Sequence, residues 1–127
     1  MSDVTVKRVE DFDTPNDGGF CRARASLGVS AFGMQVENFP PHFEHYPEHD
    51  HNDDGQEEVY TVLAGSATLH AGGQEHHLEP GVFVRVAPSV KRKITTGDEP
   101  ARMLAIGGTP GKAYVAPAFT EEGAPLG

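Results

Sequence analysis

Short apolar segments alternate with breaks rich in Gly and Pro along most of the chain, which is typical of β-structure with frequent turns. No long stretch has its apolar residues at the spacing of an amphipathic helix. This pattern predicts an all-β fold, a small antiparallel β-barrel or jelly roll. The segments predicted as strands are Val4 to Val9, Phe20 to Ala25, Val29 to Phe39, Val59 to Leu63, Ser66 to Ala71, Glu75 to Leu78, Val82 to Val86, Val90 to Thr95 and Arg102 to Ile106.

A tight hairpin turn is predicted at Ala64-Gly65, between two of these strands. In that hairpin Val59 would lie opposite His70, and opposed residues share a face of the sheet. His70 would then face away from Glu58, whereas Tyr60 would share the face of Glu58. Tyr60 is therefore a candidate for contact with a ligand, or else a core residue with its hydroxyl at the rim.

The chain has 127 residues, about the length of one domain. We expect a single domain over residues 1–127, with a core at about 20–106 and extended arms at both ends. The C-terminal arm, residues 107–127, is rich in Gly, Pro and Ala, and Tyr114 and Phe119 are its candidate anchors. The alternative is a frayed tail.

The charge of the chain argues against several partners. The formal net charge is -9, and the only basic run is the triplet at 91–93, so nucleic acid is not expected as a partner. No apolar run approaches the roughly 20 residues that span a bilayer, so no membrane role is expected either. Cys21 is the only cysteine, which excludes an internal disulfide and fits a cytoplasmic location.

Residues with metal-binding chemistry gather between His42 and Glu58. His49 and His51 are two positions apart, so on a strand both imidazoles point to one face. Glu58 opens the next predicted strand, and its carboxylate could complete a set of two histidines and one carboxylate. Such a set suits iron, manganese, nickel or zinc. The alternative is a His-rich polar surface loop without a metal, and His45 is a weaker candidate ligand in the same region.

This region resembles the first motif of the cupin superfamily. That motif has a Gly, five residues, H-x-H, three or four residues, Glu, six residues and Gly. Here His49-Asp50-His51, Glu58 and Gly65 match it, but the gap before Glu58 holds six residues, and Phe43 stands where the leading Gly would be. We expect the loop Asn52 to Gly55 to absorb the longer gap.

The second cupin motif is much less well matched. It has Gly, five residues, P-x-G, two residues, His, three residues and Asn. Gly81 supplies the opening Gly, and the remaining four positions are occupied by Ala87, Ser89, Arg92 and Thr96. The resemblance covers about residues 35–106 and implies a barrel whose metal ligands are His49, His51 and Glu58, without the fourth ligand of the family.

Arg92 stands in place of the missing histidine and cannot ligate a cation, because its guanidinium stays protonated. Three roles are open for this residue. It could hold a carboxylate or phosphate of a ligand, pair with Glu58 in place of the metal, or be exposed to solvent.

Two classes of function follow from these observations. The first is an enzyme of oxygenase or isomerase type that uses a divalent ion (Fe, Mn, Ni or Zn) on a small anionic substrate. The second is a metal-free module that binds a small molecule, with Arg92, Glu58 and Tyr60 in its pocket. A homodimer is expected in both cases, since small cupins commonly pair and closed two-fold dimers are the commonest oligomer.

Overall fold

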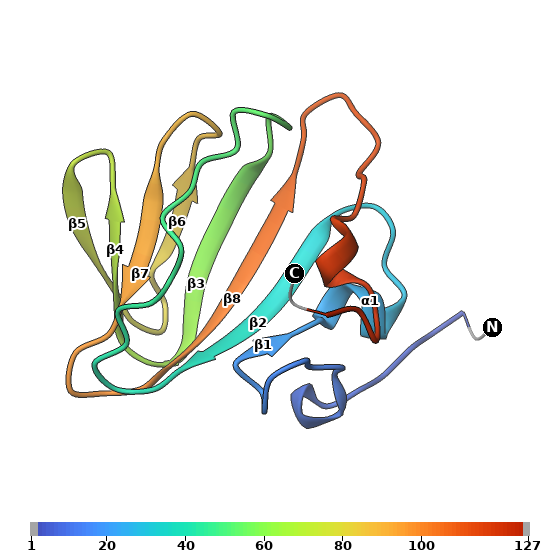
Figure 1. The fold of residues 1–127 in the computed structure, drawn as a ribbon, viewed down its shortest axis with the longest axis horizontal. Helices are drawn as coiled ribbons and strands as arrows, with labels where there is room; N and C mark the ends of the chain where they lie inside the picture. Colours follow the sequence, from blue (N-terminus) through green and yellow to red (C-terminus); the bar gives the residue numbers. More distant parts are fainter. Residues whose placement is uncertain (1–2, 126–127) are drawn as a thin grey trace.

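The computed structural model describes residues 3–125, and its elements are nearly all strands (Figure 1). Among these residues, no helix is long and apolar enough to span a membrane. The elements in chain order are η1 (Val9–Asp11), β1 (Phe20–Cys21), α1 (Ala23–Leu27), β2 (Gly33–Phe39), β3 (Glu57–Gly65), β4 (Ala67–Ala71), β5 (Gln74–Leu78), β6 (Phe83–Val86), β7 (Arg92–Thr95), β8 (Ala101–Gly108) and η2 (Ala118–Thr120), where η marks a 3-10 helix.

The strands form two antiparallel sheets. The larger has the order β1-β2-β8-β3-β6, and the smaller has the order β5-β4-β7. The buried apolar side chains of the main core come from both sheets and include Tyr60, Leu69, Ile94 and Met103. The predicted all-β, barrel-like fold is confirmed, although the two sheets do not close completely.

The N-terminal part of the chain differs from the prediction in three places, one of which is the strand predicted at Val29 to Phe39, since it begins only at Gly33. No strand forms at Val4 to Val9, where a 3-10 helix begins only at Val9. The strand predicted at Phe20 to Ala25 ends at Cys21, and the helix α1 follows it. Ala, Arg and Leu favour helix, and Gly28 ends α1 in the left-handed conformation with φ 81°. This helix packs its Ala23 against Val36 of β2.

The hairpin predicted at Ala64-Gly65 is also wrong. The strand β3 continues to Gly65 in the larger sheet, and β4 begins at Ala67 in the smaller sheet, where it pairs with β5 and β7. Gly65 has φ +75°, and a Cβ there would collide with the backbone oxygen of Pro100. Only glycine fits this crossing between the sheets without strain.

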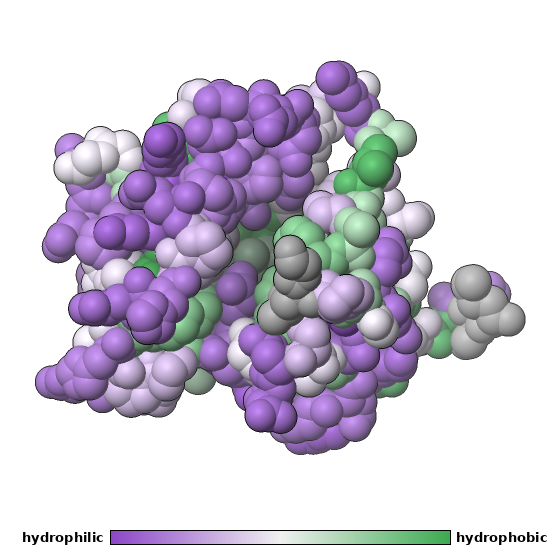
Figure 2. Space-filling model, viewed as in Figure 1, coloured by the Kyte–Doolittle hydropathy of each residue, from purple (hydrophilic) through white to green (hydrophobic). Residues whose placement is uncertain are grey.

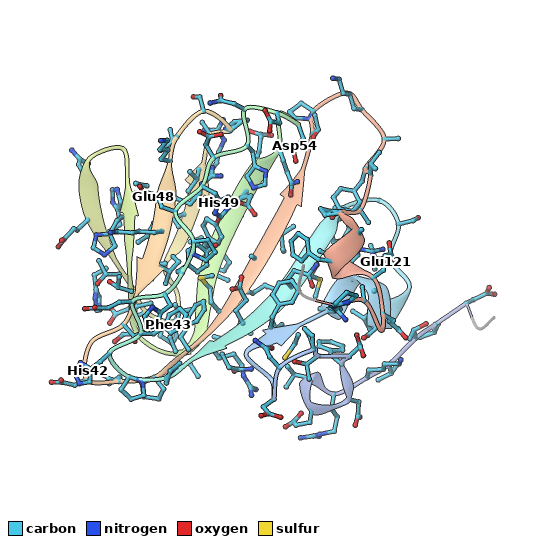
Figure 3. The ribbon with its side chains drawn as sticks, in the orientation of Figure 1. His42, Phe43, Glu48, His49, Asp54 and Glu121 are labelled. Carbon is cyan, nitrogen blue, oxygen red and sulfur yellow. The ribbon has the colours of Figure 1, made fainter. Side chains whose placement is uncertain are left out.

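The C-terminal arm packs against the larger sheet near α1 (Figure 1). Phe119 contacts Phe20, with ring centroids 5.7 Å apart, and Tyr114 packs directly over Gly33. Glu121, labelled in Figure 3, pairs with Arg24 of α1 at 3.0 Å. The two predicted anchors therefore lie in contact with the strands, and residues 126–127 of the arm lie outside the described residues.

One buried arginine holds this arm. Arg22 donates from Nε to the carbonyl of Phe119 at 2.9 Å and from Nη2 to the carbonyl of Ala124. Its Nη1 lies 2.8 Å from the carboxylate of Asp13, which also accepts from the backbone N–H of Gly123. The hydrogen bond from Arg22 lowers the pKa of Asp13. Three parts of the chain thus meet at one guanidinium.

We expect Arg22→Met to release the arm and to lower the free energy of unfolding by about 2 kcal/mol, because hydrogen bonds to a charged group are lost. Hydrogen exchange of residues 117–125 should rise well before global unfolding. Arg8→Met, at an exposed arginine, is the control in the same urea and exchange measurements. Unchanged exchange in residues 117–125 of the Arg22 variant would show that other contacts hold the arm.

Candidate metal site

His49 and His51 lie on an extended segment beside the smaller sheet. His49 forms an isolated antiparallel bridge with Arg92, with backbone hydrogen bonds of 3.1 and 2.9 Å. The N–H of His51 donates to the carbonyl of Pro88 at 2.8 Å. His49 is labelled on this segment in Figure 3, and the segment follows β2 and precedes β3 in the chain. The extended backbone directs both imidazoles inward, as their spacing predicts.

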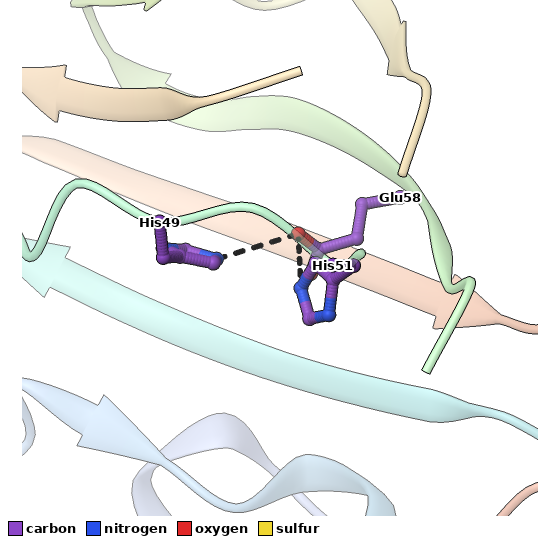
Figure 4. A group of neighbouring side chains, drawn as sticks. All are labelled: His49, His51 and Glu58. Carbon is purple, nitrogen blue, oxygen red and sulfur yellow. Dashed lines mark ion pairs between the residues drawn. The ribbon is translucent and has the colours of Figure 1, made fainter. Parts of the chain in front are cut away.

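Glu58 reaches the same place from β3 in the larger sheet (Figure 4). Its Oε1 lies 3.1 Å from Nε2 of His51 and 3.7 Å from Nε2 of His49. One donor atom from each of the three residues falls within 4.8 Å of the other two. The three candidate ligands are thus brought together across the gap between the two sheets.

The outer nitrogens of the two histidines are already hydrogen-bonded. Nδ1 of His49 lies 2.9 Å from the carbonyl of Pro47, and Nδ1 of His51 lies 3.1 Å from the carboxylate of Asp54. These contacts leave both Nε2 atoms for the centre of the site. Protein histidines that bind metals are oriented in the same way by carbonyls and carboxylates.

Asp54 belongs to the loop that lengthens the motif. The chain turns there, and the N–H of Gly55 returns to the carbonyl of His51 at 2.8 Å (Asp54 is labelled in Figure 3). The loop absorbs the longer gap as predicted, since Glu58 still reaches the two histidines. It also supplies the carboxylate that orients His51, a contribution that the motif comparison did not indicate.

Contacts with Glu58 control the protonation of the cluster. Burial disfavours the charged carboxylate, but the nearby imidazoles of His49 and His51 and the hydroxyl of Tyr60 outweigh burial and hold the pKa of Glu58 far below its usual value. The carboxylate of Glu58 in turn raises the pKa of His49 and of His51, against the effect of burial. The carboxylate is thus charged, and each imidazole gains a proton more readily than a free histidine.

The residues present fit a divalent ion. Nε2 of His51 is buried and has no hydrogen-bond partner of acceptable geometry among residues 3–125, so it is available as a ligand. Metal–ligand bonds of about 2.0–2.2 Å place neighbouring ligands of an octahedral ion roughly 3 Å apart. The 3.1 Å between His51 and Glu58 matches that spacing, and the 3.7 Å to His49 is slightly longer.

The three donors border a cavity of about 510 Å³. Figure 2 shows a hollow near the centre of the view, with hydrophobic side chains in its floor and along one side. Lining residues come from the larger sheet, from the segment that carries the histidines and from the C-terminal arm. They are Phe20, Gly33, Met34, Gln35, Glu37, Tyr46, Pro47, His49, His51, Gln56, Glu58, Ala105, Gly107, Tyr114, Pro117, Phe119 and Thr120.

Tyr60 and Arg92 lie behind Glu58 rather than in the cavity lining. The hydroxyl of Tyr60 donates to Oε1 of Glu58, and Nη1 of Arg92 lies 3.4 Å from the same oxygen. Both side chains are completely buried, and Arg92 also donates to the carbonyl of Ala87 at 2.9 Å. The two residues contact Glu58, and their contact with a ligand stays a prediction.

The remaining histidines lie outside this cluster. Nε2 of His70 is 2.8 Å from the hydroxyl of Thr95, which agrees with its predicted place away from Glu58, although the predicted hairpin was wrong. His45 stacks edge-on against Phe43 and is not part of the three-residue group.

Glu37 is a cavity residue that the sequence analysis missed. It lies on β2 and faces the cavity, and burial raises the pKa of its carboxyl to about 7, with the charge of Glu58 adding to the rise. Alternation along β2 could have placed it on the inner face with Gln35 and Phe39. No motif marked it, however, and charged residues in strands usually face solvent.

Comparisons with known proteins agree with this architecture. The family model Cupin_2, described as a cupin domain, matches residues 35–107. The chain therefore belongs to the cupin family. A search of curated proteins gives no match.

Several solved structures share the fold. A cupin protein from Bacteroides fragilis is 22% identical, with a TM-score of 0.70 over 92% of this chain and 93% of that one. A sugar phosphate isomerase of the cupin superfamily from Silicibacter pomeroyi is 26% identical, with a TM-score of 0.61 over 70% of this chain and 59% of that one. A DMSP lyase from Ruegeria pomeroyi is 24% identical, with a TM-score of 0.56 over 73% of this chain and 46% of that one.

Proposed function

We propose that this cupin binds a divalent metal ion through His49, His51 and Glu58 and acts on a small molecule held in the adjoining cavity. The observation that carries the proposal is the convergence of two imidazole nitrogens and a carboxylate oxygen within 4.8 Å. Iron, manganese, nickel and zinc all suit this donor set. A bound ion would supply Lewis acidity toward an oxygen atom of the substrate.

The side chains around the ligands have separate roles in this proposal. Asp54 and the carbonyl of Pro47 fix the ring orientations of the histidines. Tyr60 and Arg92 hold the carboxylate of Glu58 from behind. The cavity lies at the front of the cluster and admits the ligand. The isomerase and lyase with the same fold support an enzymatic role, without indicating which reaction this chain performs.

A metal-free binding module is the second candidate. It is favoured by the contact of Arg92 with Glu58 at 3.4 Å, because a guanidinium can neutralise the carboxylate in place of an ion. Elemental analysis of protein purified without a histidine tag separates the two candidates. Stoichiometric metal in that protein supports the first, and metal-free protein that also rejects added ions supports the second.

Metal binding is expected to weaken at acidic pH. The histidines must be neutral to bind an ion, and the adjacent carboxylate of Glu58 raises their pKa values, so protons begin to compete above the usual pH of ~6.5. We expect the affinity for Zn²⁺ to fall at least about tenfold between pH ~7.5 and pH ~5.5. Calorimetric titration at the two pH values measures this change, and equal affinity would contradict imidazole ligation.

We also propose a homodimer, because the exposed N-terminal segment could cover an exposed sheet edge of a partner. Light scattering at tens of micromolar protein should give twice the mass of the chain. A monomer mass at that concentration would contradict this proposal.

A further inference from the structure

Beyond the three donors, the cavity surface is mainly apolar. Aromatic rings from three parts of the chain contribute to it, and Met34, Pro47 and Pro117 add aliphatic surface. The apolar surface begins directly beside the donors, since the ring centroid of Tyr46 lies 5.8 Å from that of His49. It extends to the pair formed by Phe20 and Phe119. Its volume, about 510 Å³, falls in the range of small-molecule sites.

The cavity also lacks a cationic side chain to hold an anion. No lysine or arginine appears among its lining residues in the part of the chain that the structure describes. The two nearby buried arginines are already engaged, Arg22 with Asp13 and Arg92 with Glu58. The lining also holds the carboxyl of Glu37, which offers a phosphate no favourable partner.

The carboxyl of Glu37 offers one polar contact within this apolar surface. Its carboxyl has no hydrogen bond or ion pair with the described residues, although it lines the same cavity as the metal donors. A half-buried carboxyl that faces the cavity favours a ligand that supplies a hydrogen-bonding group at that point.

We propose that the cavity binds a small, mainly apolar molecule that carries a ring and an oxygen-rich head, with the head at the metal donors and the ring against the aromatic wall. A phosphorylated sugar is the wrong class of ligand for this wall. The position of the head rests on the proposed metal site. The apolar character of the rest of the ligand rests on the cavity lining.

Two hydroxamates with the same metal-binding head test the inference on the full chain. Co²⁺-loaded protein is titrated with benzohydroxamate and with acetohydroxamate, followed by the absorption of the cobalt ion. The same titrations with Co²⁺ in buffer correct for the affinity of each hydroxamate for the free ion. After that correction, we expect benzohydroxamate to bind at least about tenfold more tightly, because its ring buries apolar surface.

The wall is tested with Phe119→Ala, which keeps the backbone carbonyl that Arg22 binds. This change should reduce the benzohydroxamate preference at least about threefold. Phe83→Ala is the matched control, since Phe83 is 71% exposed on β6 and does not line the cavity. Equal corrected affinities of the two hydroxamates for the wild-type protein would overturn the inference, as would glucose 6-phosphate binding as tightly as benzohydroxamate.

Failure of the metal site is distinguishable from failure of this inference. If the protein takes up no Co²⁺, the metal proposal is wrong, and saturation-transfer NMR on the metal-free protein then compares benzohydroxamate with glucose 6-phosphate. Transfer to the benzohydroxamate ring, reduced in Phe119→Ala, still supports the apolar ligand class. Transfer to glucose 6-phosphate alone, or to neither probe, contradicts it.

Discussion

Replacing His51 with alanine is expected to weaken Zn²⁺ binding at least about 100-fold, since even residues that only orient a ligand contribute 10–100-fold to metal affinity. His51 is the stronger test of the two histidines, because its Nε2 is buried without a hydrogen-bond partner and lies 3.1 Å from Glu58. Asp54→Ala should have an intermediate effect of about tenfold, through loss of the hydrogen bond to Nδ1 of His51.

The control for this series is His76→Ala, which removes an exposed histidine of β5 outside the cluster. Calorimetric titration of all three variants at pH ~7.5 should give no change for His76, a moderate loss for Asp54 and a large loss for His51. Wild-type affinity in the His51 variant would place the metal elsewhere, or leave the chain as a metal-free cupin.

Arg92→His is expected to tighten Zn²⁺ binding at least about tenfold, because it removes a positive charge close to the ion and adds an imidazole. The side chain of Arg92 is 0% exposed and its Nη1 is 3.4 Å from Glu58, so the replacement faces the cluster rather than solvent. Histidine also stands at this position in the second cupin motif, which the sequence otherwise matches poorly.

The same change should destabilise the metal-free protein by about 3 kcal/mol, because breaking a buried ion pair leaves the carboxylate of Glu58 without its guanidinium. Added Zn²⁺ should recover this loss, and urea unfolding with and without the ion measures both effects. Arg8→His is the control of equal charge change at a residue 82% exposed. Unchanged affinity in Arg92→His would mean that position 92 does not reach the ion.

Local spacing accounted for much of the site and strand pattern. The two-residue spacing of His49 and His51 placed both rings on one side, and seven positions from Glu58 to Gly65 identified the strand β3. The first feature depends on backbone geometry alone, and the second rests on the resemblance to the cupin motif. The longer loop before Glu58 did not disturb them, because loops absorb insertions at little cost.

Features that depend on contacts between distant segments were not predictable in the same way. Gly65 indicates a special backbone conformation, but its sequence context does not distinguish a hairpin from a crossing between sheets. Arg22 looks like an ordinary surface residue until the carbonyls of Phe119 and Ala124 surround it. Glu37 acquires its raised pKa only from burial in the cavity and from the charge of Glu58.

Because the C-terminal arm supplies part of the cavity wall, the candidate metal donors and this part of the wall are encoded in separate stretches of the gene. The candidate metal donors lie within residues 49–58, whereas Tyr114, Pro117 and Phe119 of the cavity wall lie near the end of the chain. Exchange of the few codons for residues 114–119 would reshape the wall while leaving the donors intact. Related chains could therefore diverge in the molecules they accept through changes at the tail alone.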